Sequence, residues 1–308
     1  MAVLEAKLSH LKGRADASQG LMHAVETRMQ KLIGQASVPP GAIEPTAQQA
    51  AAYHLASGGQ RIRAQLAIHA GLALKLHEAD AVSIAAACEL LHNASLIHDD
   101  LQDRDLFRHG AKTVWSAYGD GVAICAGDLL LSAAYCALAG FSRPRLLPTL
   151  LPMLHNRIAD ASTGQCADLA CEKNRIFSLQ DYEKLAALKS GSLLALPIEL
   201  ALAAAGQLPA VPLARRAAES FAVGYQVFDD LNDVQKDLAR TTAHPAVNVV
   251  AVMQAVHPGG DARLLARQLA VAHLDMVAQS SLALPFQSGQ LLGQFAHDLS
   301  AQVSLDAA

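Results

Sequence analysis

Two groups of aspartates share one spacing in this sequence, Asp99-Asp100-Leu101-Gln102-Asp103 and Asp229-Asp230-Leu231-Asn232-Asp233. On a helix, carboxylates four residues apart lie on one face, beside the carboxylate that follows the first of them. Carboxylates this close repel one another and resist burial, but multivalent hard cations with oxygen ligands turn that cost into a gain. We therefore expect the two clusters to face each other across a cavity, hold several magnesium ions and bind a diphosphate through them.

The alternative interpretation is that each cluster is a solvated acidic helix face. However, apolar residues recur at spacings of three and four around both clusters, which is typical of buried helices. They are Leu90, Ala94, Ile97 and Leu101 around the first cluster, and Val223, Val227, Leu231 and Val234 around the second. The pattern favours a paired metal site over two surface patches.

The composition of the 308-residue chain indicates which elements carry the clusters. Apolar residues make up 52% and aromatic residues 4%, so small aliphatic side chains that favour helix dominate. The net charge of −4 and the pI near 6.3 give no electrostatic footprint for nucleic acid.

The sequence also carries signals of location. The segment from Met1 to Lys31 lacks the basic-then-apolar order of a signal peptide, and the longest apolar runs are interrupted by Glu89, His92 or Glu199. The five cysteines have no metal-binding spacing, so we interpret them as reduced thiols. We expect a cytoplasmic protein without a membrane span.

Helix-breaking residues divide the chain into segments. They fall at Pro39-Pro40-Gly41, 140–148, 206–212, His244-Pro245 and 257–260. Between them the pattern is helical nearly everywhere, and no alternating strand pattern competes with it. We predict one all-α domain over residues 1–308, a helical bundle around a central cavity with the clusters on its central helices.

Further motifs accompany the clusters in a fixed order. They are Gly58-Gly59-Gln60-Arg61-Ile62-Arg63, Glu89-Leu90-Leu91-His92, His98-Asp99-Asp100, Ala126-Gly127-Asp128, Gly164-Gln165 with Asp168, Lys189-Ser190-Gly191, and Gln226 three positions before Asp229. This series resembles the trans-isoprenyl diphosphate synthase (polyprenyl synthetase) family along nearly the whole chain. One aspartate motif is a weak signal, but the ordered series is highly specific. The resemblance implies an isoprenoid-synthase-type helical fold and a homodimer.

The resemblance also implies a magnesium-dependent prenyltransferase. The main magnesium ligands would be Asp99, Asp103 and Asp229, with the shell adjusted or completed by Asp100, Asp230 and Asp233. Magnesium, Arg108 and the catalytic Lys189 would stabilise the charge that develops on an allylic diphosphate as its carbon–oxygen bond breaks. The double bond of isopentenyl diphosphate then traps the carbocation.

Several other polar residues are candidates for substrate binding by the same resemblance. Gln165 and Gln226 would contact substrate, with helix packing as the alternative. His92 would contact isopentenyl diphosphate together with Arg63. We interpret His98, Asp128 and Asp168 as structural residues.

The sequence departs from the family mainly at the isopentenyl diphosphate site. Gln60 stands where the family has lysine, and His109 stands where it has the second of two arginines. No lysine follows the second cluster in the segment 241–245, and no lysine or arginine occurs after Arg267. Each lost charge-assisted bond is worth about 1.5–3 kcal/mol, so isopentenyl diphosphate would bind more weakly.

Three functions therefore stay open. The favoured one is an elongating prenyl diphosphate synthase whose isopentenyl diphosphate (acceptor) site is weak or altered. The first alternative is a terpene synthase or cyclase that ionises a prenyl diphosphate without isopentenyl diphosphate, because both reactions begin with the same ionisation. The second is a non-catalytic partner subunit of a synthase, against which the six retained carboxylates argue.

The residues before the first cluster bear on product length. A chain growing from that cluster would pass Ser95 and Ala94, and then Leu91 one turn further. The resemblance implies that bulky aromatic residues close the cavity at such positions and small ones leave it open. We therefore expect a chain of geranylgeranyl length or longer, with close helix packing as the alternative reason for the small residues.

Overall fold

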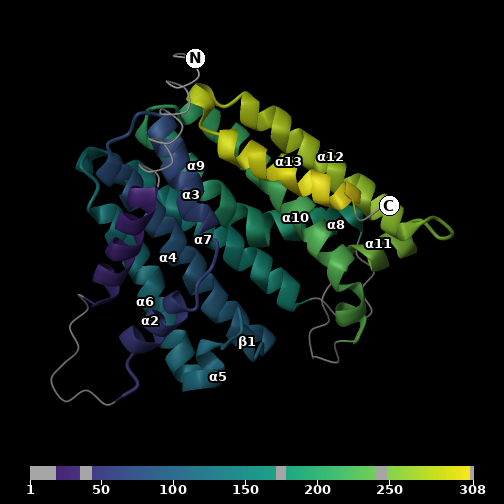
Figure 1. Cartoon of the computed structure of the whole chain (residues 1–308), viewed down its shortest axis with the longest axis horizontal. Helices are drawn as coiled ribbons and strands as arrows, with labels where there is room; N and C mark the ends of the chain where they lie inside the picture. The colour runs from purple at the N-terminus through teal and green to yellow at the C-terminus, as the bar shows by residue number, and fades with distance from the viewer. Residues whose placement is uncertain (1–18, 35–43, 171–177, 240–247, 306–308) are drawn as a thin grey trace, which may run out of the picture. The chain divides into compact units, whose positions relative to one another are not determined.

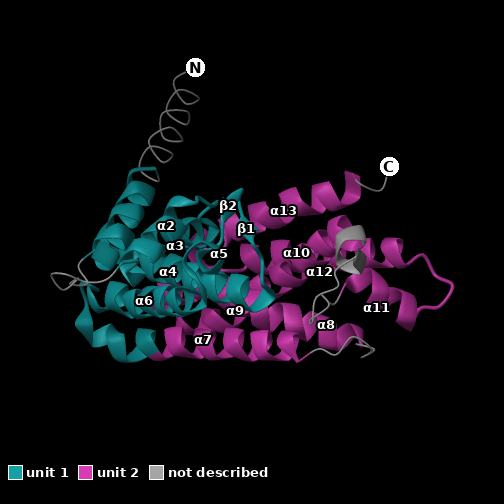
Figure 2. Cartoon of the chain, turned by 90° about the horizontal axis from the view of Figure 1, so that it is seen from below, with its two compact units in different colours: residues 1–151 teal, residues 152–308 magenta. Residues whose placement is uncertain are grey.

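The computed structural model describes residues 19–34, 44–170, 178–239 and 248–305, with only the backbone described over 235–239. The chain divides into two compact units, 1–151 and 152–308, and the boundary falls within α7 (Leu147–Leu169) (Figure 2). Most of the described residues are helical, which confirms the predicted all-α class. The prediction of a single domain stays a prediction.

Helix α4 is the centre of the first unit and packs against α3 and α6. Its Leu90 and Ile97 are fully buried, as their spacing predicted. The unit consists of a helix over residues 19–34, α2 (Ala47–Ala56), α3 (Ile62–Ala73), α4 (Glu78–Asp103), β1 (Phe107–Arg108), β2 (Ala111–Lys112), α5 (Val114–Tyr118), α6 (Asp120–Ala139) and η1 (Pro144–Leu146) (Figure 1).

Helix α10 has the same place in the second unit, where it packs against α9 and α12. Helix α13 packs against α12, and α9 is buried along its whole length. The unit consists of most of α7, then α8 (Leu179–Ala186), a π-helical turn η2 (Ala187–Gly191), α9 (Ser192–Ala204), η3 (Leu208–Ala210), α10 (Val211–Ala239), α11 (Val249–Val256), α12 (Ala262–Leu282), η4 (Pro285–Gln287) and α13 (Gln290–Leu305) (Figure 1).

Local sequence signals set the helix ends. Thr46 with Gln49, and Ser178 with Asp181, form capping boxes that satisfy the first backbone N–H groups of α2 and α8. The predicted breaks at 140–148, 206–212 and 257–260 all separate helices. The breaks at Pro39-Pro40-Gly41 and His244-Pro245 lie outside the described residues.

A short hairpin of β1 and β2 follows α4, and the sequence pattern did not predict it. Arg108 pairs with Ala111 across the loop, where both central residues have positive φ, 51° at His109 and 81° at Gly110. Positive φ at both positions is the type I′ geometry that matches the twist of paired strands. Strands of two residues are too short to show an alternating pattern in the sequence. The geometry of the turn, rather than the strand residues, therefore determines this hairpin.

Two helical segments, Asp120–Ala139 and Leu179–Ala204, are long and apolar enough to cross a membrane. In the second, 72% of the most apolar stretch is buried, and its Glu199 is paired with Arg157 and Arg215. Core helices of globular proteins have the same length and composition. The absence of a membrane span and the cytoplasmic location both stay predictions.

Candidate active site

The first aspartate cluster lies at the C-terminal end of α4. Its inner aspartate, Asp100, is 1% exposed, whereas Asp99 and Asp103 are partly exposed. The guanidinium of Arg108 donates to Asp100 through Nε at 2.9 Å and through a terminal nitrogen at 2.7 Å. Such a two-point pair fixes both side chains. The predicted ligand Asp100 and the predicted diphosphate contact Arg108 are therefore bound to each other.

The hairpin explains how Arg108 reaches the cluster. Strand β1 follows directly after α4 and carries Arg108 back to Asp100. The hydrogen bonds between Arg108 and Asp100 also change the pKa of the guanidinium. Burial alone lowers the pKa of Arg108, but the hydrogen bond and negative charge of Asp100 outweigh burial and raise the pKa above its usual value. Arg108 thus keeps its positive charge beside the cluster.

Cationic side chains of the first unit surround two histidines, the buried His54 and the partly buried His92. Burial, followed by the charge of Arg108, lowers the pKa of His54 to about 4, although a hydrogen bond with Asn93 opposes this shift. Burial, followed by the charges of Arg63 and Arg108, lowers the pKa of His92 well below its usual value. Both rings are therefore neutral near pH 7, so the positive charge in this part of the unit comes from the arginines.

The loop with the predicted acceptor residues is held by Glu89. This buried carboxylate lies 3.7 Å from the Arg61 guanidinium and accepts from the backbone N–H of Ala64 at 3.2 Å. Arg61 also donates to the Leu55 carbonyl at 2.8 Å. Of the predicted substrate residues, Gln60 and His109 are exposed, and Arg63 is partly buried.

The second cluster is anchored by its inner aspartate as well. Asp230 is 4% exposed, and its carboxylate accepts from Tyr182 Oη at 2.9 Å, Gln226 Nε2 at 2.8 Å and the backbone N–H of Val249 at 2.7 Å. Its backbone carbonyl accepts from Asn248 at 2.9 Å. Asp229 is exposed and Asp233 partly exposed. Gln226, a predicted substrate contact, here supports the cluster.

Glycines of the matched motifs allow the close packing that positions Lys189. A Cβ on Gly164 of α7 would lie 2.6 Å from the Lys189 backbone nitrogen, and one on Gly191 would lie 2.9 Å from the Cα of Glu219 in α10. The π-helical turn that holds Lys189 therefore fits only beside glycine. The lysine amine donates to Asp168, which we had interpreted as structural, and Gln165 follows Gly164 as a partly buried residue.

His98 packs against a third glycine of these motifs. A Cβ on Gly127 would lie 2.1 Å from His98 Nε2, and that nitrogen lies 3.7 Å from an Asp128 carboxylate oxygen. The glycine thus provides the space for the imidazole ring. This packing supports the structural interpretation of both His98 and Asp128.

The predicted chain-length residues differ in accessibility. Leu91 and Ala94 are 3% and 1% exposed, whereas Ser95 is partly exposed and its hydroxyl donates to the His92 carbonyl at 2.8 Å. Of the three side chains, only Ser95 is open enough to meet a growing chain. The role of all three in chain length stays a prediction.

The described residues contain no group of three or more His, Cys, Asp or Glu side chains close enough to form a metal site. Magnesium rarely needs one, because it usually binds through one or two carboxylates together with water and substrate phosphates. The outer aspartates Asp99, Asp103, Asp229 and Asp233 provide such oxygen ligands on exposed or partly exposed positions. The residues fit magnesium in this mode. Because the clusters lie in different units, their approach across a cavity stays a prediction.

Sequence reasoning missed three contributors to these sites. Tyr182 and Asn248 bind Asp230 from positions 48 and 18 residues away, without any motif of their own. The hairpin that carries Arg108 was missed as well. The aspartate clusters could be found because their carboxylates recur at a fixed spacing. Contacts between single residues far apart in the sequence have no such spacing.

Comparison with known proteins agrees with the fold and the motifs. Residues 44–245 match the polyprenyl synthetase family. The chain is 31% identical over 248 residues to geranylgeranyl diphosphate synthase of Mycobacterium tuberculosis, covering 80% of this chain and 69% of that protein. It is 33% identical to the chloroplastic geranylgeranyl pyrophosphate synthase of Capsicum annuum, covering 61% of this chain and 53% of that one.

The fold has solved relatives. The crystal structure of a decaprenyl diphosphate synthase from Rhodobacter capsulatus has a TM-score of 0.79 at 18% identity, covering 94% of this chain and 98% of that one. This likeness shows that the two share an all-α fold. The chain belongs to the polyprenyl synthetase family. The predictions of family, fold and prenyltransferase class are confirmed.

Proposed function

We propose that this protein is a magnesium-dependent trans-prenyl diphosphate synthase that joins an allylic diphosphate to isopentenyl diphosphate. The observation that carries the proposal is the common design of the two clusters. In each, protein donors bind the buried inner aspartate, and the outer aspartates lie at exposed or partly exposed positions. The geranylgeranyl diphosphate synthases among the relatives support the same activity.

In this proposal the outer aspartates Asp99, Asp103 and Asp229 hold the metal, with Asp233 completing the shell. Magnesium, when bound, supplies positive charge that stabilises the diphosphate leaving group. Asp100 positions Arg108, and Asp168 positions Lys189, so that each cation reaches the diphosphate with little reorganisation. No side chain of the motifs needs to act as a nucleophile.

We propose that Arg63 and His92 bind isopentenyl diphosphate, the acceptor of the prenyl group. The exposed Gln60 and His109 would lie at the edge of that binding site. Neutral His92 offers hydrogen bonding without charge, because its pKa is lowered well below the usual value. The proposed length of the product follows from Ser95, whose small side chain leaves space on the α4 face. We therefore favour a product of geranylgeranyl length or longer.

The alternative of a terpene synthase is favoured by one observation, the loss of two cationic positions at Gln60 and His109. Incubation with labelled allylic diphosphate and magnesium, with and without isopentenyl diphosphate, separates the two functions. A longer prenyl diphosphate that requires isopentenyl diphosphate supports the proposal. A cyclic hydrocarbon or alcohol formed without it contradicts the proposal, and no turnover indicates a partner subunit.

We also propose a homodimer. Helix α6 is strongly apolar, yet Ile124 is 49% exposed and both Cys125 and Cys136 are exposed. An apolar helix with an exposed face fits burial against a second copy. Sedimentation should give twice the 32.4 kDa chain mass, and a mass of one chain would contradict the proposal.

A further inference from the structure

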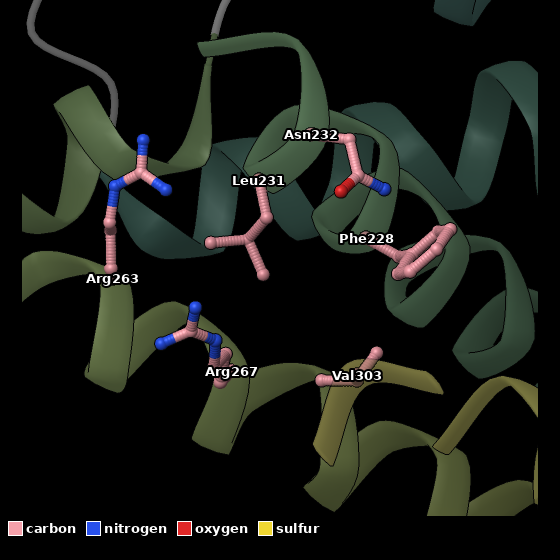
Figure 3. Close-up of a pocket in the computed structure, with 6 residues that line it drawn as sticks. All are labelled: Phe228, Leu231, Asn232, Arg263, Arg267 and Val303. Atoms are coloured by element: carbon pink, nitrogen blue, oxygen red, sulfur yellow. The ribbon is translucent and has the colours of Figure 1, made fainter. Parts of the chain in front are cut away.

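The second unit contains a pocket of about 320 Å³ among α10, α12 and α13 (Figure 3). None of the predicted site residues lines it. Its lining residues come from all three helices and are Phe228, Leu231, Asn232, Arg263, Arg267 and Val303. Because pockets for small molecules usually measure about 300–1,000 Å³, this one suits a small ligand.

The two arginines of the pocket lie apart from Phe228 and Val303, with Leu231 between them and Asn232 beside Phe228 (Figure 3). Figure 3 shows the guanidinium groups of Arg263 and Arg267 on one side and the side chains of Phe228 and Val303 on the other. The two arginines lie one turn apart on α12, so they present their donors together. Arg263 is exposed and forms no ion pair within the part of the chain that the structure describes. A guanidinium is well suited to binding phosphate oxygens at two points.

The apolar part of the pocket on α10 is turned away from the outer aspartates. Leu231, which lines the pocket, is two residues from both Asp229 and Asp233, a rotation of about 200° around the helix. Asn232 at the rim lies three residues from Asp229 and so nearer to it around the helix, whereas the apolar part of the pocket at Leu231 faces away from the outer aspartates.

We propose that this pocket binds a small anionic amphiphile, a phosphate group with a short apolar tail. The phosphate binds Arg263 and Arg267, and the Asn232 amide adds a hydrogen-bonding group at the rim. The tail packs against Phe228, Leu231 and the buried Val303. This site is additional to the proposed transferase site, and binding at it requires no magnesium.

Calorimetry of the full chain with hexyl phosphate tests the proposal. EDTA is included, so that the magnesium-dependent site does not contribute and the outcome is independent of the proposed transferase function. One hexyl phosphate should bind per chain, and Arg263→Ala should weaken binding about tenfold, because a charge-assisted bond is lost. The matched control is Arg216→Ala, which removes another exposed arginine of the same unit and should change binding by less than about twofold.

Two further measurements separate the sources of affinity. Inorganic phosphate should bind more weakly than hexyl phosphate, and Phe228→Ala should weaken hexyl phosphate but not phosphate. Equal affinities for the two probes would overturn the amphiphilic part of the proposal. Absence of binding, or binding that persists in Arg263→Ala and is lost in Arg108→Ala, would overturn the site itself. Circular dichroism of each variant checks that the fold is retained.

Discussion

The two aspartate clusters have the same spacing, but the protein stabilises their inner carboxylates differently. Asp100 binds a guanidinium, that of Arg108, whereas Asp230 binds a hydroxyl, an amide and a backbone N–H, all neutral. A charged donor therefore holds the inner carboxylate of the first cluster, whereas these three donors to the inner carboxylate of the second are neutral.

This difference also shows that identical motifs do not define the binding partners of their carboxylates. In both clusters the inner aspartate is a structural anchor, and the outer positions are the ones open to ligands. A motif of five residues gives the positions of the carboxylates, but the partners of each carboxylate come from other elements. We therefore expect substitutions at inner and outer positions to have separate effects on stability and on turnover.

The largest effect is expected at the outer aspartates. Asp99→Ala or Asp229→Ala should lower turnover by at least about a hundredfold, because each removes a magnesium ligand that stabilises the leaving group. Helical circular dichroism should not change. Activity within a few-fold of the parent in either variant would show that the clusters do not form a paired metal site.

The inner aspartates should differ from each other in stability. Asp100→Asn removes the hydrogen-bonded counter-charge of the partly buried Arg108, leaving only the more weakly acting Asp99 and Asp105, and should lower the free energy of unfolding by about 3 kcal/mol. Asp230→Asn keeps an acceptor for neutral donors and should cost only about 1–2 kcal/mol. Urea denaturation measures both values.

A double variant sharpens this comparison. Asp100→Asn with Arg108→Met should recover part of the loss, because no buried charge remains unpaired. Equal losses of unfolding free energy in Asp100→Asn and Asp230→Asn, with no recovery in the double variant, would mean that the charge of Arg108 does not distinguish the clusters.

A smaller effect is expected on the acceptor side of the first unit. Gln60→Lys with His109→Arg should lower the KM for isopentenyl diphosphate about tenfold, because two cations would face its diphosphate, and affect the allylic substrate less. Gln60→Lys alone is the control, since it leaves the positive φ of the hairpin turn at residue 109 undisturbed. If calorimetry detects no tighter binding of isopentenyl diphosphate to the double variant, these positions do not face it.

The smallest effect is expected on product length. Ser95→Phe should shorten the longest product while short substrates are still ionised, because a phenyl ring would block the α4 face below the first cluster. Ala94→Phe is a less direct test, since Ala94 is 1% exposed and a larger side chain would overpack the core. Product profiles that match the parent in both variants would place the growing chain elsewhere.

Helix periodicity and breakers predicted much of the fold from local sequence. The burial of Leu90 and Ile97 follows from their spacing, and the turn at Gly206 follows from its residue type. The two-residue strands around Gly110 could not be predicted, because so short a pattern carries no period. The hairpin is what brings Arg108 to Asp100.

The candidate site was predictable only in part for a related reason. The family motifs marked Gly164 and Lys189 separately, but their close approach depends on how α7 packs against the π-helical turn. Likewise, Tyr182 reaches Asp230 over 48 residues of sequence, and no spacing rule connects the two. The positions of the two aspartate clusters were therefore evident from the sequence, whereas the residues that bind their inner carboxylates were not.

Thermal unfolding with magnesium and inorganic diphosphate tests most directly whether the outer aspartates of both clusters hold metal and diphosphate together. A ligand that binds only the folded state raises the unfolding midpoint, independently of turnover. The midpoint of the parent should rise only when magnesium and diphosphate are both present, and Asp99→Asn and Asp229→Asn should each abolish that rise. A rise of the parent's size in either variant would contradict the account.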